Sequence, residues 1–194
     1  LSGPGPVEVT LRRPPPLDVP LTIVPGPTGG IEVRGPDGDL VAQVAVVEPF
    51  SATVPGVPLD EAAQAATGYA GFTDHPFPTC YVCGPGRDDG LRIFPGPLPD
   101  GRTAAPFVVP ADVSPATVWA ALDCPGGWSI IAPGRPYVLG RMAAVVSELP
   151  AAGDECVVVG ATQRIEGRKA LVHSTLYGPT GVRLAYARAT WIAI

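Results

Sequence analysis

Apolar and polar residues alternate along most of this chain, which is the pattern of β-strands. The alternation predicts four short strands near the N-terminus, at 7–12, 21–24, 31–34 and 40–47. Turn sequences rich in Pro and Gly separate them. Further strands are predicted later in the chain, at 91–95, 103–109, 137–149, 155–166, 169–177 and 182–194. The long closing strands favour a large, curved antiparallel sheet.

One segment has helical rather than strand spacing. Ser114 and Pro115 form a helix start, because Ser caps free backbone N–H groups and Pro is tolerated at the first helical position. Val118, Ala121 and Leu122 then follow at helical spacing, and Pro125 is expected to stop or kink the helix. One helix among many strands predicts an α+β fold with the helix packed on the sheet.

An internal repeat divides the chain. The segment from Gly35, GPDGDLVAQVA, and the segment from Gly178, GPTGVRLAYAR, both run from a turn into an alternating strand. This pattern predicts three parts, which are a partial first repeat of strands at 1–50, a connector with a short helix at 51–79 and a complete repeat at 80–194. The alternative is a chance similarity, since GPxG turns are common between strands.

Composition excludes several classes of protein. The 194 residues include 24 Gly and 26 Pro, but 46% are hydrophobic and only 16% are charged, so the chain is folded rather than disordered. A net charge of −5 gives no basic surface for nucleic acid. No apolar run is long enough for a membrane span, and no signal segment opens the sequence. A cytoplasmic protein is expected.

The four cysteines raise the question of a metal. Cys80 and Cys83 form a C-x-x-C pair, and structural zinc needs four ligands. His75, Cys124 and Cys156 are the residues that could complete the set. No second C-x-x-C pair exists, so the favoured interpretation is small buried cysteines at a strand entry. Neither a metal nor a cofactor is predicted.

Three segments in order carry a family likeness: CYVCG from Cys80, GLRIF from Gly90 and WAALDCPGGWS from Trp119. They resemble the hotdog-fold acyl-CoA thioesterase superfamily, in its phenylacetyl-CoA thioesterase-like and double-hotdog forms. The resemblance implies a curved antiparallel sheet wrapped around a central helix, paired with a second hotdog, and acyl-CoA as ligand. Many relatives have His-Gly-Gly at the helix start, where this chain has Val-Ser-Pro.

Asp123 is the leading catalytic candidate. It matches the helix carboxylate that serves relatives as general base or nucleophile in thioester hydrolysis. It is also the only acidic residue in 113–147, beside Leu122 and near Trp128, and partial burial there would raise its pKa toward the range of a base. The alternative is a structural carboxylate that caps the N–H groups of Gly126 and Gly127.

The rest of the predicted site is less specific. Backbone N–H groups would stabilise the oxyanion, at Ala116 and Thr117 or at Gly126 and Gly127. Turn geometry is the alternative reason for the two glycines. Substrate-binding residues are expected among Trp119, Trp128 and Arg141, although a solvated strand face is the common place for such an arginine.

The sequence therefore predicts metal-free hydrolysis of an acyl-CoA or related acyl thioester. A non-catalytic acyl-CoA or lipid-binding hotdog module is the alternative from another class. A hotdog hydratase or dehydratase is a further one, on the basis of His75 in DHPFP. A homodimer is expected, because an incomplete sheet would leave unpaired strand edges.

Overall fold

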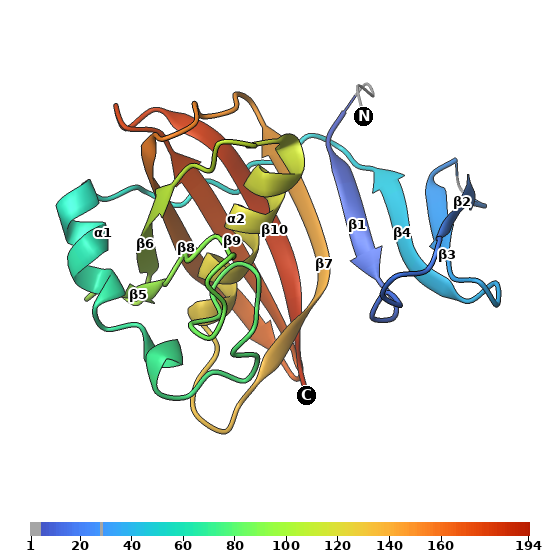
Figure 1. Cartoon of the computed structure of the whole chain (residues 1–194), viewed down its shortest axis with the longest axis horizontal. Coiled ribbons are helices and arrows are strands. Elements are labelled where there is room, and N and C mark those ends of the chain that lie inside the picture. Colours follow the sequence, from blue (N-terminus) through green and yellow to red (C-terminus); the bar gives the residue numbers. More distant parts are fainter. Residues whose placement is uncertain (1–4, 28) are drawn as a thin grey trace.

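A computed structural model describes residues 5–27 and 29–194. Ten strands form one antiparallel sheet in the order β2-β3-β4-β1-β7-β10-β9-β8-β6-β5 (Figure 1). In chain order the strands are β1 (Val7–Leu11), β2 (Thr22–Pro25), β3 (Ile31–Arg34), β4 (Leu40–Val46), β5 (Gly96–Pro97), β6 (Thr103–Val108), β7 (Tyr137–Val146), β8 (Glu155–Glu166), β9 (Lys169–Tyr177) and β10 (Arg183–Ala193).

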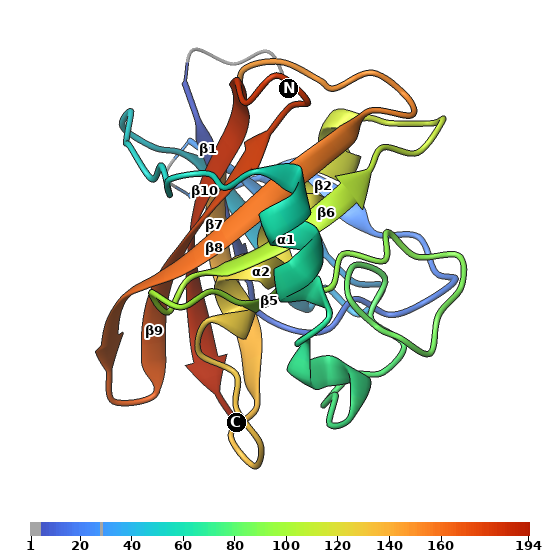
Figure 2. The same cartoon turned by 90° about the vertical axis from the view of Figure 1, so that its left-hand side faces the viewer.

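The helix α2 (Pro115–Trp128) lies across the concave face of β6–β10 (Figures 1 and 2). It begins as predicted, because the Ser114 side chain accepts the Thr117 N–H and the Thr117 side chain accepts the Ser114 N–H. Its buried residues join the strands in one hydrophobic core that includes Val118, Leu122 and Phe107. This central helix in a curved antiparallel sheet is the predicted α+β hotdog arrangement.

Shorter elements join the N-terminal strands to this core. The helix α1 (Leu59–Ala66) packs on β6, and a 3-10 turn, η1 (Ala70–Phe72), follows it. An irregular loop then runs from 73 to 95 before β5 begins. The loop carries Cys80 and Cys83, and buried residues such as Ile93 anchor it to the core.

The first four strands extend the same sheet from the edge of β7. β1 pairs with β7, with Glu8 opposite Ala143. These four strands are here called the N-terminal layer. Their order, β2-β3-β4-β1, corresponds to the order β8-β9-β10-β7 in the rest of the sheet. The side of the layer that faces α2 is apolar, and it includes Val7, Val9 and Val44. No helix of the described residues lies on β2, β3 or β4 (Figure 1).

The expected stop of the helix at Pro125 and the expected strand at 91–95 are wrong, whereas the expected kink at Pro125 stays a prediction. The helix α2 does not stop at Pro125 but continues to Trp128, and side chains of the sheet bind the backbone near the proline. Thr103 Oγ1 donates to the Pro125 carbonyl at 2.6 Å, and the Gly126 N–H donates to Ser174 Oγ at 3.0 Å. The strand expected at 91–95 is irregular, because Arg92 has a φ of 54°, which breaks an extended backbone.

Candidate functional site

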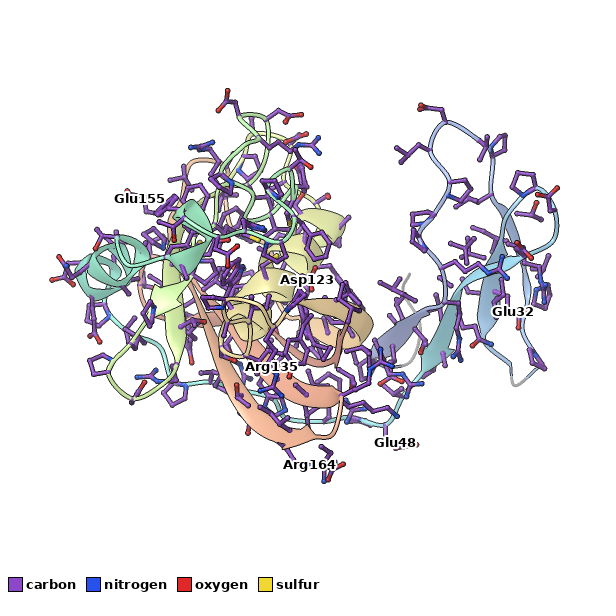
Figure 3. The ribbon with its side chains drawn as sticks, turned by 90° about the horizontal axis from the view of Figure 1, so that it is seen from below. Glu32, Glu48, Asp123, Arg135, Glu155 and Arg164 are labelled. Carbon is purple, nitrogen blue, oxygen red and sulfur yellow. The ribbon has the colours of Figure 1, made fainter. Side chains whose placement is uncertain are left out.

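Asp123 lies on α2 and faces the interior of the molecule (Figure 3). Its Oδ1 atom is buried and has no hydrogen-bond partner among the described residues. The residue lines a cavity of about 320 Å³, here called the Asp123 cavity. The other lining residues are mostly apolar or sulfur-containing: His75, Pro76, Phe77, Cys80, Cys83, Cys124, Trp128, Ile131, Tyr137, Val138, Leu139 and Trp191.

Burial governs the acidity of this carboxyl group. Loss of hydration on burial and, to a smaller extent, negative charge at Cys80 together raise the pKa of Asp123 to about 7. No lysine or arginine is among the described residues that line the cavity, so nothing there offsets the effect. A carboxyl group with this pKa can take up and release a proton near neutral pH.

Two more buried polar atoms are on residues that line the same cavity. Tyr137 Oη and Trp191 Nε1 have no hydrogen-bond partner within the described part of the chain, and both residues line the Asp123 cavity. An unpaired buried donor costs about 1–3 kcal/mol, so such groups point to a ligand or to water. The sequence analysis missed these residues, because each reads as an ordinary aromatic residue in a strand.

Two of the predicted oxyanion donors already have acceptors within the protein. The Gly126 N–H is bound to Ser174, and the Thr117 N–H is bound to the capping Ser114 side chain. Ala116 is at the start of the helix. A helix rises by about 1.5 Å per residue, so Ala116 lies about 10 Å from Asp123 along the helix axis. Gly127 is a packing residue, because a Cβ there would lie 2.5 Å from the Trp191 ring.

The three predicted substrate-binding residues lie in three places. Trp128 lines the Asp123 cavity. Trp119 lines a different depression of about 700 Å³, the helix-start groove, between the beginning of α2 and the strands β1 and β7. Arg141 is on the opposite face of the sheet, where it pairs with Glu8 at 3.3 Å and donates to Thr10 Oγ1 at 2.9 Å.

Three of the four cysteines come together beside Asp123. The sulfur atoms of Cys80, Cys83 and Cys124 all lie within 4.8 Å of one another. All four cysteines are free thiols. Cys156 is buried in another part of the core. Hydrogen bonds from Cys124 and Cys83 lower the pKa of Cys80. Sequence spacing left Cys124 as one of three residues that could join the C-x-x-C pair, and the packing of α2 brings its sulfur atom to them.

Comparison with solved structures relates this fold to known proteins. A crystal structure of a thioesterase superfamily protein matches with a TM-score of 0.53 and 14% identity, over 59% of this chain and 60% of that chain. The match thus spans less than two thirds of that protein's length. This likeness in fold confirms the hotdog resemblance that the sequence motifs indicated.

Other matches have lower TM-scores. A protein from Streptococcus mutans UA159 bound to acetyl-CoA matches with a TM-score of 0.45 and 15% identity, over 48% of this chain and 82% of that chain. The PaaI protein of the E. coli phenylacetic acid degradation operon matches with a TM-score of 0.44 and 11% identity, over 47% of this chain and 76% of that chain.

Sequence comparison gives no match to a protein-family model or to a curated protein. In the part of the chain that the structure describes, no helix has the length and apolar character needed to cross a membrane.

Proposed function

We propose that this chain hydrolyses an acyl-CoA or a related acyl thioester in the Asp123 cavity. The observation that carries the proposal is the set of three unpaired buried polar atoms, Asp123 Oδ1, Tyr137 Oη and Trp191 Nε1, on residues that line one apolar cavity. The addition of water to a carbonyl group needs a base for the water proton and hydrogen-bond donors for the carbonyl oxygen. The carboxylate can serve as the base, and the two neutral groups can serve as the donors.

The reaction would proceed by general base catalysis. The Asp123 carboxylate would take a proton from water as the water oxygen attacks the thioester carbonyl carbon. The Tyr137 O–H and the Trp191 N–H would donate to the carbonyl oxygen as it becomes negative, in place of the backbone groups predicted from sequence. The C–S bond then breaks, and the thiolate leaving group takes a proton to give the free acid and CoA. Direct attack by Asp123 on the carbonyl carbon is the other route open to this residue.

The surroundings of Asp123 suit an acyl group better than a polar substrate. The aliphatic residues Ile131 and Leu139 and the Trp128 ring line the cavity beside Asp123. A volume of about 320 Å³ lies at the lower end of the range for small-molecule sites. Charged headgroups would remain outside, since no described lining residue is cationic.

Release of CoA from a panel of acyl-CoA substrates tests the proposal. Chromatographic detection of CoA avoids the thiols of the protein. We expect Asp123→Asn to lower kcat at least about 100-fold with little change in melting temperature, because the two side chains have almost the same shape. Asp112→Asn is the matched control, since Asp112 is an exposed acid just before the same helix.

Full turnover by Asp123→Asn would exclude Asp123 as the base. Saturable binding of acyl-CoA without any turnover by the unmodified chain would instead identify a non-catalytic binding module. Release of water from, or its addition to, an acyl-CoA with the thioester left intact would identify a hydratase or dehydratase.

We also infer that residues 7–46 are the second half of another hotdog unit. The support is the shared strand order and the antiparallel pairing of β1 with β7, which joins corresponding strands of the two parts. In this interpretation the layer keeps the four closing strands of a unit and lacks its helix. A crystal structure in which β1–β4 pair in a different order would contradict it.

A second copy of the chain would cover the exposed apolar face of that layer. Ile23 is 68% exposed and Val46 is 58% exposed, and β2 is a strand at the edge of the sheet. Light scattering during gel filtration should give the mass of two chains. Ile23→Asp should reduce that mass to one chain, whereas Val182→Asp, at an exposed position outside the layer, should not. A one-chain mass for the unmodified protein would contradict the homodimer.

A further inference from the structure

The loop from 73 to 95 folds tightly around Cys80. The Gly84 N–H donates to the Cys80 carbonyl at 2.9 Å, and the Gly86 N–H donates to the Pro78 carbonyl at 2.9 Å. A Cβ on Gly84 would lie 2.4 Å from the Cys80 backbone nitrogen, so this turn requires glycine. The turn brings the thiols of Cys80 and Cys83 to within 3.6 Å of each other.

The helix α2 supplies a third sulfur atom to this pair. Cys124 Sγ lies 3.8 Å from Cys80 Sγ. Three thiolates on one tetrahedral zinc ion, with Zn–S bonds of about 2.3 Å, have sulfur atoms about 3.8 Å apart. The Cys80–Cys83 and Cys80–Cys124 sulfur separations of 3.6 and 3.8 Å match this sulfur–sulfur distance. They are too long for a disulfide bond, which is about 2.05 Å.

Hydrogen-bond donors lie beside the Cys83 sulfur atom, whereas hydrogen bonding to Cys80 and burial raise the pKa of Cys83 to about 12 and that of Cys124 well above its usual value. Cys83 Sγ lies 3.3 Å from His75 Nε2 and 3.3 Å from the Trp128 Nε1–H donor. Side-chain hydrogen bonds with Cys124 and Cys83, and to a smaller extent the backbone N–H groups of Cys83 and Val82, lower the pKa of Cys80. Donors of this kind stabilise thiolates, yet no described residue that lines the Asp123 cavity is a lysine or an arginine.

His75 is a hydrogen-bond partner rather than a fourth ligand in this geometry. Its Nδ1 accepts the Phe77 N–H at 2.9 Å, which places the proton of the neutral ring on Nε2. Nε2 therefore donates to Cys83 Sγ, and it has no free electron pair for a metal. Such a donor stabilises a thiolate ligand from outside the coordination shell.

We propose that Cys80, Cys83 and Cys124 bind one Zn²⁺ through their Sγ atoms, with the fourth coordination position facing the Asp123 cavity. Thiolate is a preferred ligand for this ion, and binding would release the thiol protons to solvent. The ion would fix the loop to α2 directly beside Asp123. The argument for this site rests on the sulfur geometry and not on hydrolysis, although the site shares the cavity of the proposed function.

Metal analysis of the full chain tests the site. We expect the protein, purified under reducing conditions, supplied with Zn²⁺ and then dialysed, to retain about one zinc per chain. Cys80→Ala, Cys83→Ala and Cys124→Ala should each reduce the zinc to background. Cys156→Ala is the matched control, because Cys156 is equally buried but lies outside the group, and it should retain the metal.

A second measurement does not depend on the folding of these variants. Unmodified protein loaded with Co²⁺ should show the near-ultraviolet charge-transfer absorption of thiolate ligands and the visible bands of a tetrahedral ion. Removal of zinc by a chelator should lower the melting temperature of the same protein.

Other variants separate the site from its neighbours. His75→Gln should keep about one zinc with an affinity about 10–100-fold weaker, and complete loss would overturn the three-thiolate assignment. Asp123→Asn should keep its zinc even where hydrolysis is lost, so the two proposals can fail separately. Absence of zinc from the reduced unmodified chain, or equal loss in Cys156→Ala, would overturn the site.

Discussion

Ser174 of β9 accepts a hydrogen bond from the Gly126 N–H of α2 at 3.0 Å. Both residues are buried, and the bond joins the sheet to the helix one residue after Pro125. A proline within a helix leaves backbone groups without their usual partners. Ser174 and Thr103 bind polar groups on either side of this position, so the helix can continue through the proline.

Replacement of this serine should destabilise the fold. Ser174→Ala leaves the Gly126 N–H buried without an acceptor, and we expect the free energy of unfolding to fall by about 1–3 kcal/mol. Urea denaturation measures the change. Ser147→Ala, at an exposed position, should change it by less than about 0.5 kcal/mol. Equal effects of the two substitutions would show that the Ser174 bond contributes nothing.

Gly160 of β8 lies directly against the backbone of α2. A Cβ at this position would lie 2.2 Å from the Pro125 carbonyl carbon and 2.4 Å from the Gly126 nitrogen. These are backbone atoms, so Gly160→Ala should separate α2 from β8 and lower the free energy of unfolding by about 1–3 kcal/mol or more. Gly35→Ala is the control, since its nearest neighbours would be 3.9 Å away. An unchanged urea midpoint for Gly160→Ala would contradict this packing.

Tyr137 should affect activity and stability in opposite directions. Tyr137→Phe removes a buried hydroxyl group that has no partner among the described residues, so stability should stay equal or rise. If the hydroxyl donates to the oxyanion, kcat should fall about 100- to 1,000-fold. CoA release and thermal melting measure the two effects.

Tyr186→Phe provides the matched control for this tyrosine. Tyr186 Oη donates to the Phe50 carbonyl at 2.9 Å, outside the Asp123 cavity. Its loss should lower stability by about 1 kcal/mol and leave kcat unchanged. Unchanged kcat in Tyr137→Phe would remove Tyr137 from the proposed mechanism.

His173 should make stability depend on pH. Burial, and then the neighbouring Arg188, lower its pKa from the usual 6.5 in the folded chain. The unfolded chain therefore binds more protons as pH falls through about 6.5, and the folded state loses stability until its own pKa is passed. His173→Gln should reduce this loss, measured by urea denaturation in steps below pH 7. An identical pH dependence in the two proteins would contradict the shift.

Most of the fold could be predicted because its strands alternate clearly. The predicted range 31–34 is β3, and the predicted 155–166 and 169–177 are β8 and β9. The helix start also followed from Ser114 and Pro115. The helix end did not, because its continuation past Pro125 depends on side chains of distant strands, which local sequence does not specify.

The candidate site was less accessible to sequence reasoning. Asp123 could be found because it is an isolated acid in an apolar helix. Tyr137 and Trp191 could not, since the absence of a hydrogen-bond partner is a property of the folded interior. Cys124 joins Cys80 and Cys83 only after α2 packs against the loop, so three sulfur atoms separated in sequence form one group in space.

The pairing of β1 with β7 also sets an order of events during synthesis. The strands β1–β4 are translated before the strand that pairs with β1, Tyr137–Val146. Until then the apolar side of β1–β4 has neither a neighbouring strand nor a core against which to pack. Unpaired strand edges of this kind favour misassembly, so the edge of β1 is protected only after β7 has been synthesised.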